Sequence, residues 1–198
     1  MFDFGGVVVD WDGTASLVRL MRGRLSTEQA RLFWLNSPAL KQFETGRCGA
    51  PEFARAVLAE LGLAMAPGDF LEAFRSWDRG VLPGAVEVLE QLKPRFTMAC
   101  LSNNNPLHWS SPHLQGLLRH FQYCFVSFEI GLAKPDPAVF KHAVRVLDLP
   151  ANEILFLDDN PECVRGAQEV GLMAAQAVGT AGVRRALAEV GIALKPGA

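Results

Sequence analysis

Four short polar stretches of the chain carry the groups that phosphoryl-transfer chemistry requires. They contain Asp3, Ser102, Lys134 and the pair Asp158-Asp159. A carboxylate nucleophile, a hydroxyl donor, a fixed ammonium and further carboxylates for a divalent cation can position a phosphoryl group and neutralise its oxygens. Taken singly, each stretch is as typical of a turn or a helix cap. Their combination is what points to chemistry.

The elements around these stretches predict an α/β fold. Apolar, β-rich runs and stretches with helical spacing alternate from about residue 83 to the end. This alternation predicts a Rossmann-like parallel sheet with helices on both faces. Because ligands bind beyond the carboxyl ends of such strands, the polar stretches should meet at one edge. The expected strands are 97–101, 123–126, 153–157 and, more weakly, 172–175, and the expected helices are 85–92, 137–147 and 163–170.

Residues 14–82 have a different pattern, which predicts an inserted all-helical module. No strand candidate of comparable strength interrupts its amphipathic stretches, and Ser26 resembles the N-cap of one helix. The predicted organisation is a core of residues 1–13 and 83–198 with a helical module of residues 14–82. The expected helices of the module are 16–22, 26–35, 51–61 and 67–75.

In their order, the four stretches resemble the motifs of the haloacid dehalogenase-like hydrolase superfamily, most of whose members are magnesium-dependent phosphatases. The family motifs are an Asp after the first strand, a Ser or Thr after the next, a Lys often followed by Pro-x-Pro, and an acidic pair after an apolar strand. The corresponding segments are 3–7, 101–103, 131–140 and 156–160. The segment 82–85, Leu-Pro-Gly-Ala, is similar to the family's return from a helical cap inserted after the first motif.

The resemblance implies a role for each site residue. Asp3 would attack phosphorus and form a phosphoaspartyl intermediate. Ser102 would donate to a phosphate oxygen, and Lys134 would neutralise charge and orient Asp3. Gly6 and Asn103 would contact the substrate. The implied partner is a small phosphorylated metabolite, such as a sugar phosphate.

The resemblance also implies a magnesium site. The Asp3 carboxylate, the Gly5 carbonyl and a carboxylate of the acidic pair would hold Mg²⁺. Alignment with the family's usual apolar-Gly-Asp makes Asp159 the better ligand and Asp158 the second candidate. Oxygen ligands suit Mg²⁺, which keeps some of its waters and shares the phosphate.

Two registers are open for the first motif. The family pattern Asp-x-Asp-Gly-Thr is spelled by residues 10–14, but that register leaves Asp3 without a role and places Gly5-Gly6 close to or inside a strand, where glycine is poorly tolerated. The other register makes Asp3 the nucleophile, and we favour it. The opening Phe-Asp-Phe-Gly-Gly-Val then resembles a branch that includes sugar-1-phosphate phosphatases. Asp10 and Asp12 are alternatively turn or cap residues.

The favoured register puts Gly5 where the family usually carries its general acid and base. Such a group is commonly worth roughly 10²–10⁴ in rate. We therefore expect a slow enzyme or one specialised for good leaving groups, unless Asp10, Asp12, a residue of the helical module, or water and Mg²⁺ replace the missing acid. Cys163 also stands where many members have another acidic residue, and we interpret it as a small buried residue.

These departures leave two other hypotheses open. Dehalogenases of the superfamily also lack the second Asp of the first motif, although they need no metal and generally lack the acidic pair. A non-catalytic domain that binds a phosphorylated ligand or a protein is the other alternative. Substrate choice is expected to depend on residues 14–80, although aromatic residues there are more often core. Residues that could line the entrance are Trp34, Phe43, Glu44, Arg47, Trp77 and Arg79, with Asn104, His108 and Trp109 after the second motif.

Composition excludes several partners. The 198 residues carry a formal net charge of −2, so no basic stripe for nucleic acid is expected. No apolar run approaches the roughly 20 residues that span a bilayer, and the four cysteines form no C-x-x-C pair. We expect a cytoplasmic protein without membrane partners. Because only two residues precede Asp3, fewer than the usual strand of about 5–6 residues, the natural start is expected upstream. The oligomeric state is not predicted.

Overall fold

The structure, a computed structural model, describes residues 1–195 and has the predicted α/β fold. Its central sheet contains two pairs of parallel strands. Ser102 lies opposite Val126 at the end of one pair, and Asp158 lies opposite Gln176 at the end of the other. The strands are β3 (Ala99–Ser102) beside β4 (Tyr123–Val126), and β5 (Leu155–Asp158) beside β6 (Met173–Gln176).

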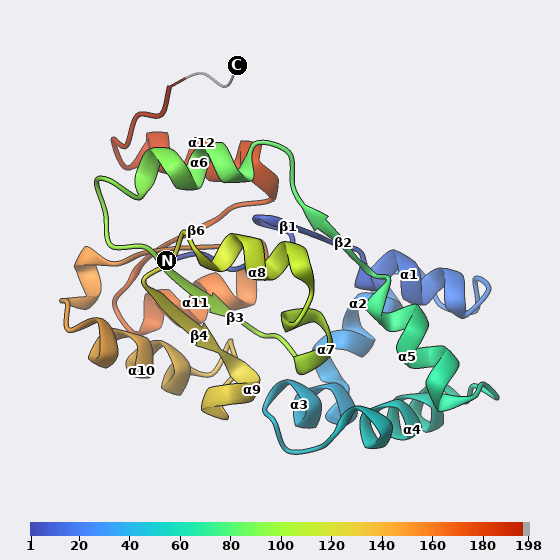
Figure 1. The fold of residues 1–198 in the computed structure, drawn as a ribbon. Helices are drawn as coiled ribbons and strands as arrows, with labels where there is room; N and C mark the ends of the chain where they lie inside the picture. Colours follow the sequence, from blue (N-terminus) through green and yellow to red (C-terminus); the bar gives the residue numbers. More distant parts are fainter. Residues whose placement is uncertain (196–198) are drawn as a thin grey trace.

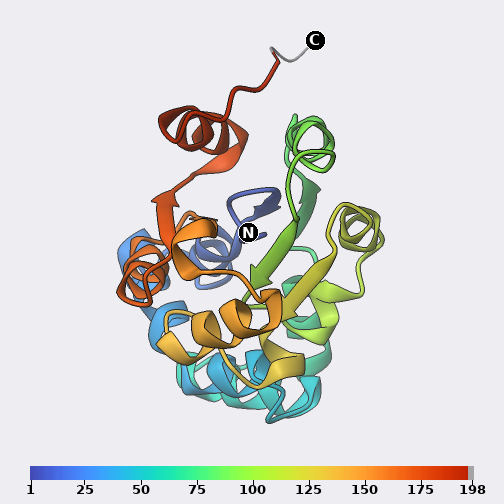
Figure 2. The same cartoon turned by 90° about the vertical axis from the view of Figure 1, so that its left-hand side faces the viewer.

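The first residues of the chain join the two strand pairs. Phe2 forms parallel bridges with Cys100 of β3 and Leu157 of β5, and the Asp3 amide donates to the Leu157 carbonyl over 2.8 Å. Figures 1 and 2 both show the N-terminus among the strands of the sheet. The predicted first strand is therefore present, although it is very short, and Asp3 stands at its carboxyl end.

Helices cover both faces of the sheet, as predicted. Phe2 points into the apolar cluster on one face and Met1 into the cluster on the other, because successive residues of a strand face opposite ways. The first face carries α6 (Ala85–Leu92), α8 (Pro112–Leu118) and α12 (Gly179–Glu189), and the second carries α10 (Pro137–Leu147) and α11 (Pro161–Glu169). The remaining short helices are α7 (Pro106–Trp109), α9 (Ser127–Ile130) and a 3-10 turn at Ala151–Glu153.

The helical module has an apolar cluster of its own. Aromatic rings fill it, and the Phe43 and Phe53 rings stack with centroids 4.4 Å apart. Ser26 is the predicted N-cap and forms a reciprocal capping box with Gln29. Figure 1 shows the five helices gathered to one side of the sheet, with α3 near α9. They are α1 (Gly13–Leu20), α2 (Thr27–Asn36), α3 (Pro38–Glu44), α4 (Ala50–Leu61) and α5 (Pro67–Arg75).

Two elements of this region were not predicted. Helix α3 begins after the N-cap Ser37, whose hydroxyl accepts from the Leu40 amide. The expectation of an entirely helical segment 14–82 is wrong at its end, because β2 (Asp78–Val81) pairs antiparallel with β1 (Val9–Trp11). These strands form a ribbon where the chain enters and leaves the module. Among residues 1–195, no helix is long and apolar enough to cross a membrane.

Candidate functional site

The predicted site residues converge on a buried lysine at the carboxyl edge of the sheet. The Lys134 ammonium lies 2.8 Å from Asp3 Oδ1 and 2.6 Å from Asp158 Oδ2. All three residues are buried. An ammonium between two carboxylates in a low-dielectric setting is costly to assemble unless every charge is paired, so this arrangement is a functional candidate.

The sheet and one loop position these three groups. Asp3 ends the central strand segment and Asp158 ends β5, which places both at one edge. Lys134 arrives in the loop after α9, where the Asn103 side chain holds its backbone. Asn103 Nδ2 donates to the Lys134 carbonyl over 2.9 Å, and the Lys134 amide donates to Asn103 Oδ1 over 2.8 Å. The predicted substrate contact of Asn103 thus has its amide committed to positioning Lys134.

Burial and neighbouring charges shift the pKa values of the cluster. Burial raises the pKa of Asp3 to about 7, Lys134 opposes this shift, and Asp158 and Asp159 add to it. Burial alone would lower the pKa of Lys134, but the carboxylates of Asp158 and Asp3 outweigh it and raise that pKa above its ordinary value. Lys134 therefore stays protonated, and the surrounding carboxylates favour the binding of a further cation.

Three carboxylates could hold a metal ion at this edge. Ligand oxygens of Asp3, Asp158 and Asp159 lie within 4.8 Å of one another. Asp158 is the most committed, since it accepts from Lys134 and, at Oδ1, from the Asn160 amide. Among residues 1–195 no other residue donates to the Asp159 carboxylate, and burial, followed by the charge of Asp158, raises its pKa to about 6. Oxygen donors of this kind fit Mg²⁺.

Two adjacent glycines differ in what surrounds them. Gly6 has a φ of +70°, and a Cβ there would lie 2.4 Å from Asp159 Oδ2, so glycine is what lets the acidic pair approach the first loop. The three atoms nearest to a Cβ on Gly5 would all belong to the Trp11 side chain, the first of them at 3.5 Å. The position where the family usually has an acid therefore faces an indole ring.

Ser102 and Cys163 are both buried. Ser102 is the buried last residue of β3, and within residues 1–195 its hydroxyl makes only a long contact of 3.5 Å to the Asn103 carbonyl. Cys163 is buried in the first turn of α11, as interpreted from the sequence, and burial raises the pKa of its thiol. Neither feature supplies a carboxylate to the cluster.

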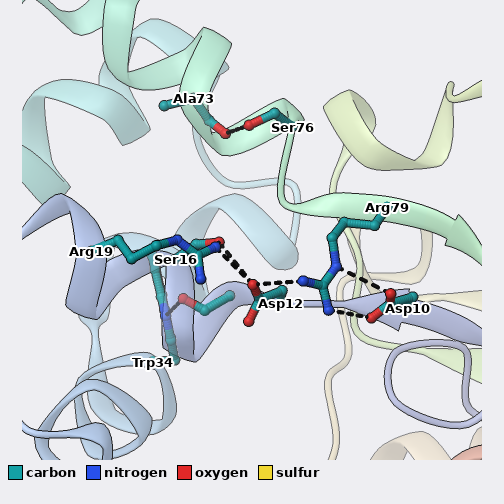
Figure 3. Close-up of polar contacts among 9 residues, drawn as sticks. Asp10, Asp12, Ser16, Arg19, Trp34, Ala73, Ser76 and Arg79 are labelled. Atoms are coloured by element: carbon teal, nitrogen blue, oxygen red, sulfur yellow. Dashed lines mark hydrogen bonds and ion pairs between the residues drawn. The ribbon is translucent and has the colours of Figure 1, made fainter.

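Asp10 and Asp12 form ion pairs outside this cluster. Arg79 of β2 contacts both oxygens of Asp10, at 2.7 and 3.1 Å, and Asp12 at 3.0 Å. Figure 3 shows the guanidinium between the two carboxylates, with Arg19 and Ser16 on the far side of Asp12. Asp12 occupies the N-cap position of α1 but makes no capping hydrogen bond. Both carboxylates therefore tie the two strands of the ribbon together.

The helical module contributes one carboxylate that sequence reasoning did not single out. Glu44 ends α3 and is half-buried. Burial raises its pKa to about 7, with Lys134 opposing the shift and Asp3 adding to it. The sequence named Glu44 only as one of several entrance candidates. Of the others, Phe43 and Trp77 are buried in the module core, as the alternative interpretation of such aromatics expects.

His108 joins the core to the module. Its Nδ1 lies 3.1 Å from Asn105 Nδ2 and its Nε2 lies 2.8 Å from the Phe74 carbonyl of α5. Burial lowers the pKa of this imidazole. With both ring nitrogens bonded, His108 is a structural contact between the two regions.

Comparisons with known proteins show the family and the fold. A family model described as haloacid dehalogenase-like hydrolase matches residues 1–171. The chain is 25% identical over 179 residues to a D-ribitol-5-phosphate phosphatase of Bacteroides thetaiotaomicron, which covers 86% of this chain and 87% of that protein.

Two solved structures show the same fold. A haloacid dehalogenase family enzyme of Bacteroides thetaiotaomicron, in complex with magnesium and inorganic phosphate, matches with a TM-score of 0.69 at 21% identity, covering 89% of this chain and 91% of that one. An L-2-haloacid dehalogenase of Xanthobacter autotrophicus matches with a TM-score of 0.65 at 23% identity, covering 98% and 83%.

Proposed function

The chain belongs to the haloacid dehalogenase-like hydrolases, and within that family we propose that it is a Mg²⁺-dependent phosphatase acting through a phosphoaspartyl intermediate on Asp3. The observation that carries this proposal is the Lys134 ammonium placed between Asp3 and Asp158, with Asp159 beside them. A nucleophilic carboxylate, a fixed cation and a metal-ligating carboxylate then occupy one edge of the sheet.

Each residue of the cluster has its own role in the proposed reaction. An Asp3 carboxylate oxygen attacks phosphorus while the bond to the leaving oxygen breaks, and water later releases phosphate from Asp3. Lys134 orients the nucleophile and neutralises equatorial oxygens, and Ser102 donates a hydrogen bond to one of them. Mg²⁺ held by Asp3, Asp159 and the Gly5 carbonyl, with Asp158 as a further candidate, would supply the remaining positive charge.

The substrate we propose is a small phosphorylated metabolite, of the sugar or sugar-alcohol phosphate class. A relative that covers most of this chain is named as a D-ribitol-5-phosphate phosphatase, which supports this class. The helical module, as a cap over the edge of the sheet, would select the organic part of the substrate and exclude water. Its core is separate from the sheet clusters, as a moving lid requires.

A carbon–halogen hydrolase is the second candidate, because Gly5 removes the second carboxylate of the first motif. The acidic pair argues against it, since displacement of a halide by Asp3 needs no divalent cation. Incubation with 2-chloropropionate separates the two: chloride release without added metal supports a dehalogenase, whereas its absence beside phosphate release supports a phosphatase.

The direct test is phosphate release from a panel of sugar and sugar-alcohol phosphates, with Mg²⁺ and with excess EDTA. We expect activity that EDTA abolishes. Asp3→Asn should lose at least about 10³-fold of kcat, because it removes the nucleophile. Asp10→Asn is the matched control and should retain activity. Full activity of Asp3→Asn together with loss in Asp10→Asn would show that the other register holds the nucleophile.

A further inference from the structure

We infer that Glu44 of the helical module protonates the leaving group of the substrate, in place of the carboxylate that Gly5 lacks. The inference rests on the proposed phosphatase activity. It gives the module a chemical role in addition to substrate selection, because an uncapped core would lack its proton donor.

The contacts of helix α3 bring Glu44 to the core. Helix α3, whose last residue is Glu44, packs against α9. Helix α9 directly follows β4. Two residues after Glu44, Gly46 has a φ of +69°, and a Cβ there would lie 2.3 Å from the Phe128 carbonyl oxygen of α9. The chain after Glu44 therefore lies directly on the core backbone, and only glycine permits that approach. The His108–Phe74 hydrogen bond is a second, independent contact between module and core.

The Glu44 carboxyl is chemically uncommitted. Within residues 1–195 no hydrogen bond reaches it, and the charged groups that act on it are Lys134 and Asp3. It therefore lies within electrostatic range of the nucleophile, on the side contributed by the module. Burial raises its pKa to about 7, which keeps a protonated fraction near neutral pH and supports the same assignment.

Asp10 and Asp12, which the sequence offers as replacements for the missing acid, are committed elsewhere. Asp10 and Asp12 are paired with Arg79 in the ribbon, as Figure 3 shows. His108 has both ring nitrogens bonded. Trp11, whose side chain faces Gly5, carries no acidic proton. Glu44, by contrast, has no such partner within residues 1–195, and Lys134 and Asp3 are the charged groups that act on it.

The proton balance of the proposed step is simple. As the Asp3 oxygen bonds to phosphorus, the bond from phosphorus to the leaving oxygen breaks, and Glu44 gives its proton to that oxygen, so that an alcohol departs. The Glu44 carboxylate then takes a proton from the water that attacks the phosphoaspartyl group. Glu44 ends protonated, and the net reaction is hydrolysis of the ester.

Two substrates that differ in leaving group test this role. p-Nitrophenyl phosphate leaves as a stabilised phenolate and needs little protonation, whereas D-ribitol 5-phosphate leaves as an alkoxide and needs a full proton. Glu44→Gln should lower kcat/KM for ribitol 5-phosphate by on the order of 10²-fold or more. The loss of kcat/KM for p-nitrophenyl phosphate should be at least about tenfold smaller. Glu72→Gln, at an exposed glutamate of α5, is the matched control and should change neither value.

The ratio of the two values is measured in one preparation, so a partly misfolded sample does not alter it. Glu44→Ala should shift the ratio in the same direction. An equal loss of kcat/KM on both substrates would overturn the assignment. No loss of kcat/KM on either substrate would also overturn it, and would mean that water and Mg²⁺ suffice. If the wild-type protein hydrolyses neither substrate nor any other phosphate ester, the proposed function has failed instead.

Discussion

Two cations of this protein each bridge a pair of carboxylates, with similar geometry and opposite surroundings. Lys134 lies 2.8 and 2.6 Å from Asp3 and Asp158, and its side chain is 3% exposed. Arg79 lies 2.7 and 3.0 Å from Asp10 and Asp12, and its side chain is 51% exposed. The distances between cation and carboxylate do not distinguish the two clusters, whereas the exposure of the cation to solvent does.

The surroundings decide what each bridge contributes. In the buried cluster, charges interact strongly and the pKa of Asp3 rises to about 7, so assembling these groups is costly and is explained by chemistry rather than by stability. In the ribbon, water and salt screen the charges, and an exposed pair contributes between about 0 and 1 kcal/mol. The two acidic stretches near the N-terminus thus serve different purposes, one for the site and one for the connection to the module.

The largest effect is expected from removing the buried cation. Lys134→Met leaves Asp3 and Asp158 without their partner, so the free energy of unfolding should fall by about 3–5 kcal/mol, and activity should be lost. The loss should be larger at pH 8 than at pH 5, because acid neutralises the carboxylates left behind. Urea unfolding in EDTA at both pH values measures this. A loss below about 1 kcal/mol, which is typical of an exposed pair, would erase the distinction between the two clusters.

A smaller effect is expected from crowding the buried cluster without changing its charge. Gly6→Ala would press a methyl group against Asp159, so the Mg²⁺ concentration for half-maximal activity should rise by about 10–100-fold. Gly23→Ala is the matched control, because Gly23 has a φ of +73° and nothing within 4 Å. Both variants should lose about 1–2 kcal/mol from the left-handed backbone, but only Gly6→Ala should alter the Mg²⁺ requirement. Equal Mg²⁺ requirements would contradict a metal role for Asp159.

The sequence predicts that the polar stretches meet at one edge of the sheet, because local rules determine that grouping. Asp3 and Asp158 each end an apolar strand, Lys134 lies in the loop after the helix that follows β4, and parallel strands bring their carboxyl ends to one edge. Lys134 and Asp158 could therefore be assigned to the site from their order along the chain. The register of the first motif was harder, since residues 10–14 match the familiar pattern letter for letter. What places Asp3 in the cluster is the pairing of Phe2 with two distant strands.

Features that depend on distant contacts were missed. Residues 78–81, Asp-Arg-Gly-Val, lack the alternation of a strand and form β2 only because they meet β1. Helix α3 is not among the predicted helices, although Ser37-Pro38 is a typical helix start. The position of Glu44 depends on that helix and on the contact of Gly46 with the core, so a single sequence could not single it out. In the sequence, the only indication of this position is that Gly46 follows Glu44 by two residues.

The smallest effect is expected in the ribbon, where a double-mutant cycle measures the exposed bridge. Arg79→Gln, Asp10→Asn and the double variant should show a coupling free energy of about 0.2–1 kcal/mol in unfolding, falling further in 1 M salt. Hydrolysis of p-nitrophenyl phosphate should change little in any of them. A coupling that resists salt and exceeds about 2 kcal/mol would mean that the ribbon is electrostatically as demanding as the buried cluster. The contrast between Lys134 and Arg79 would then come from their partners rather than from solvent.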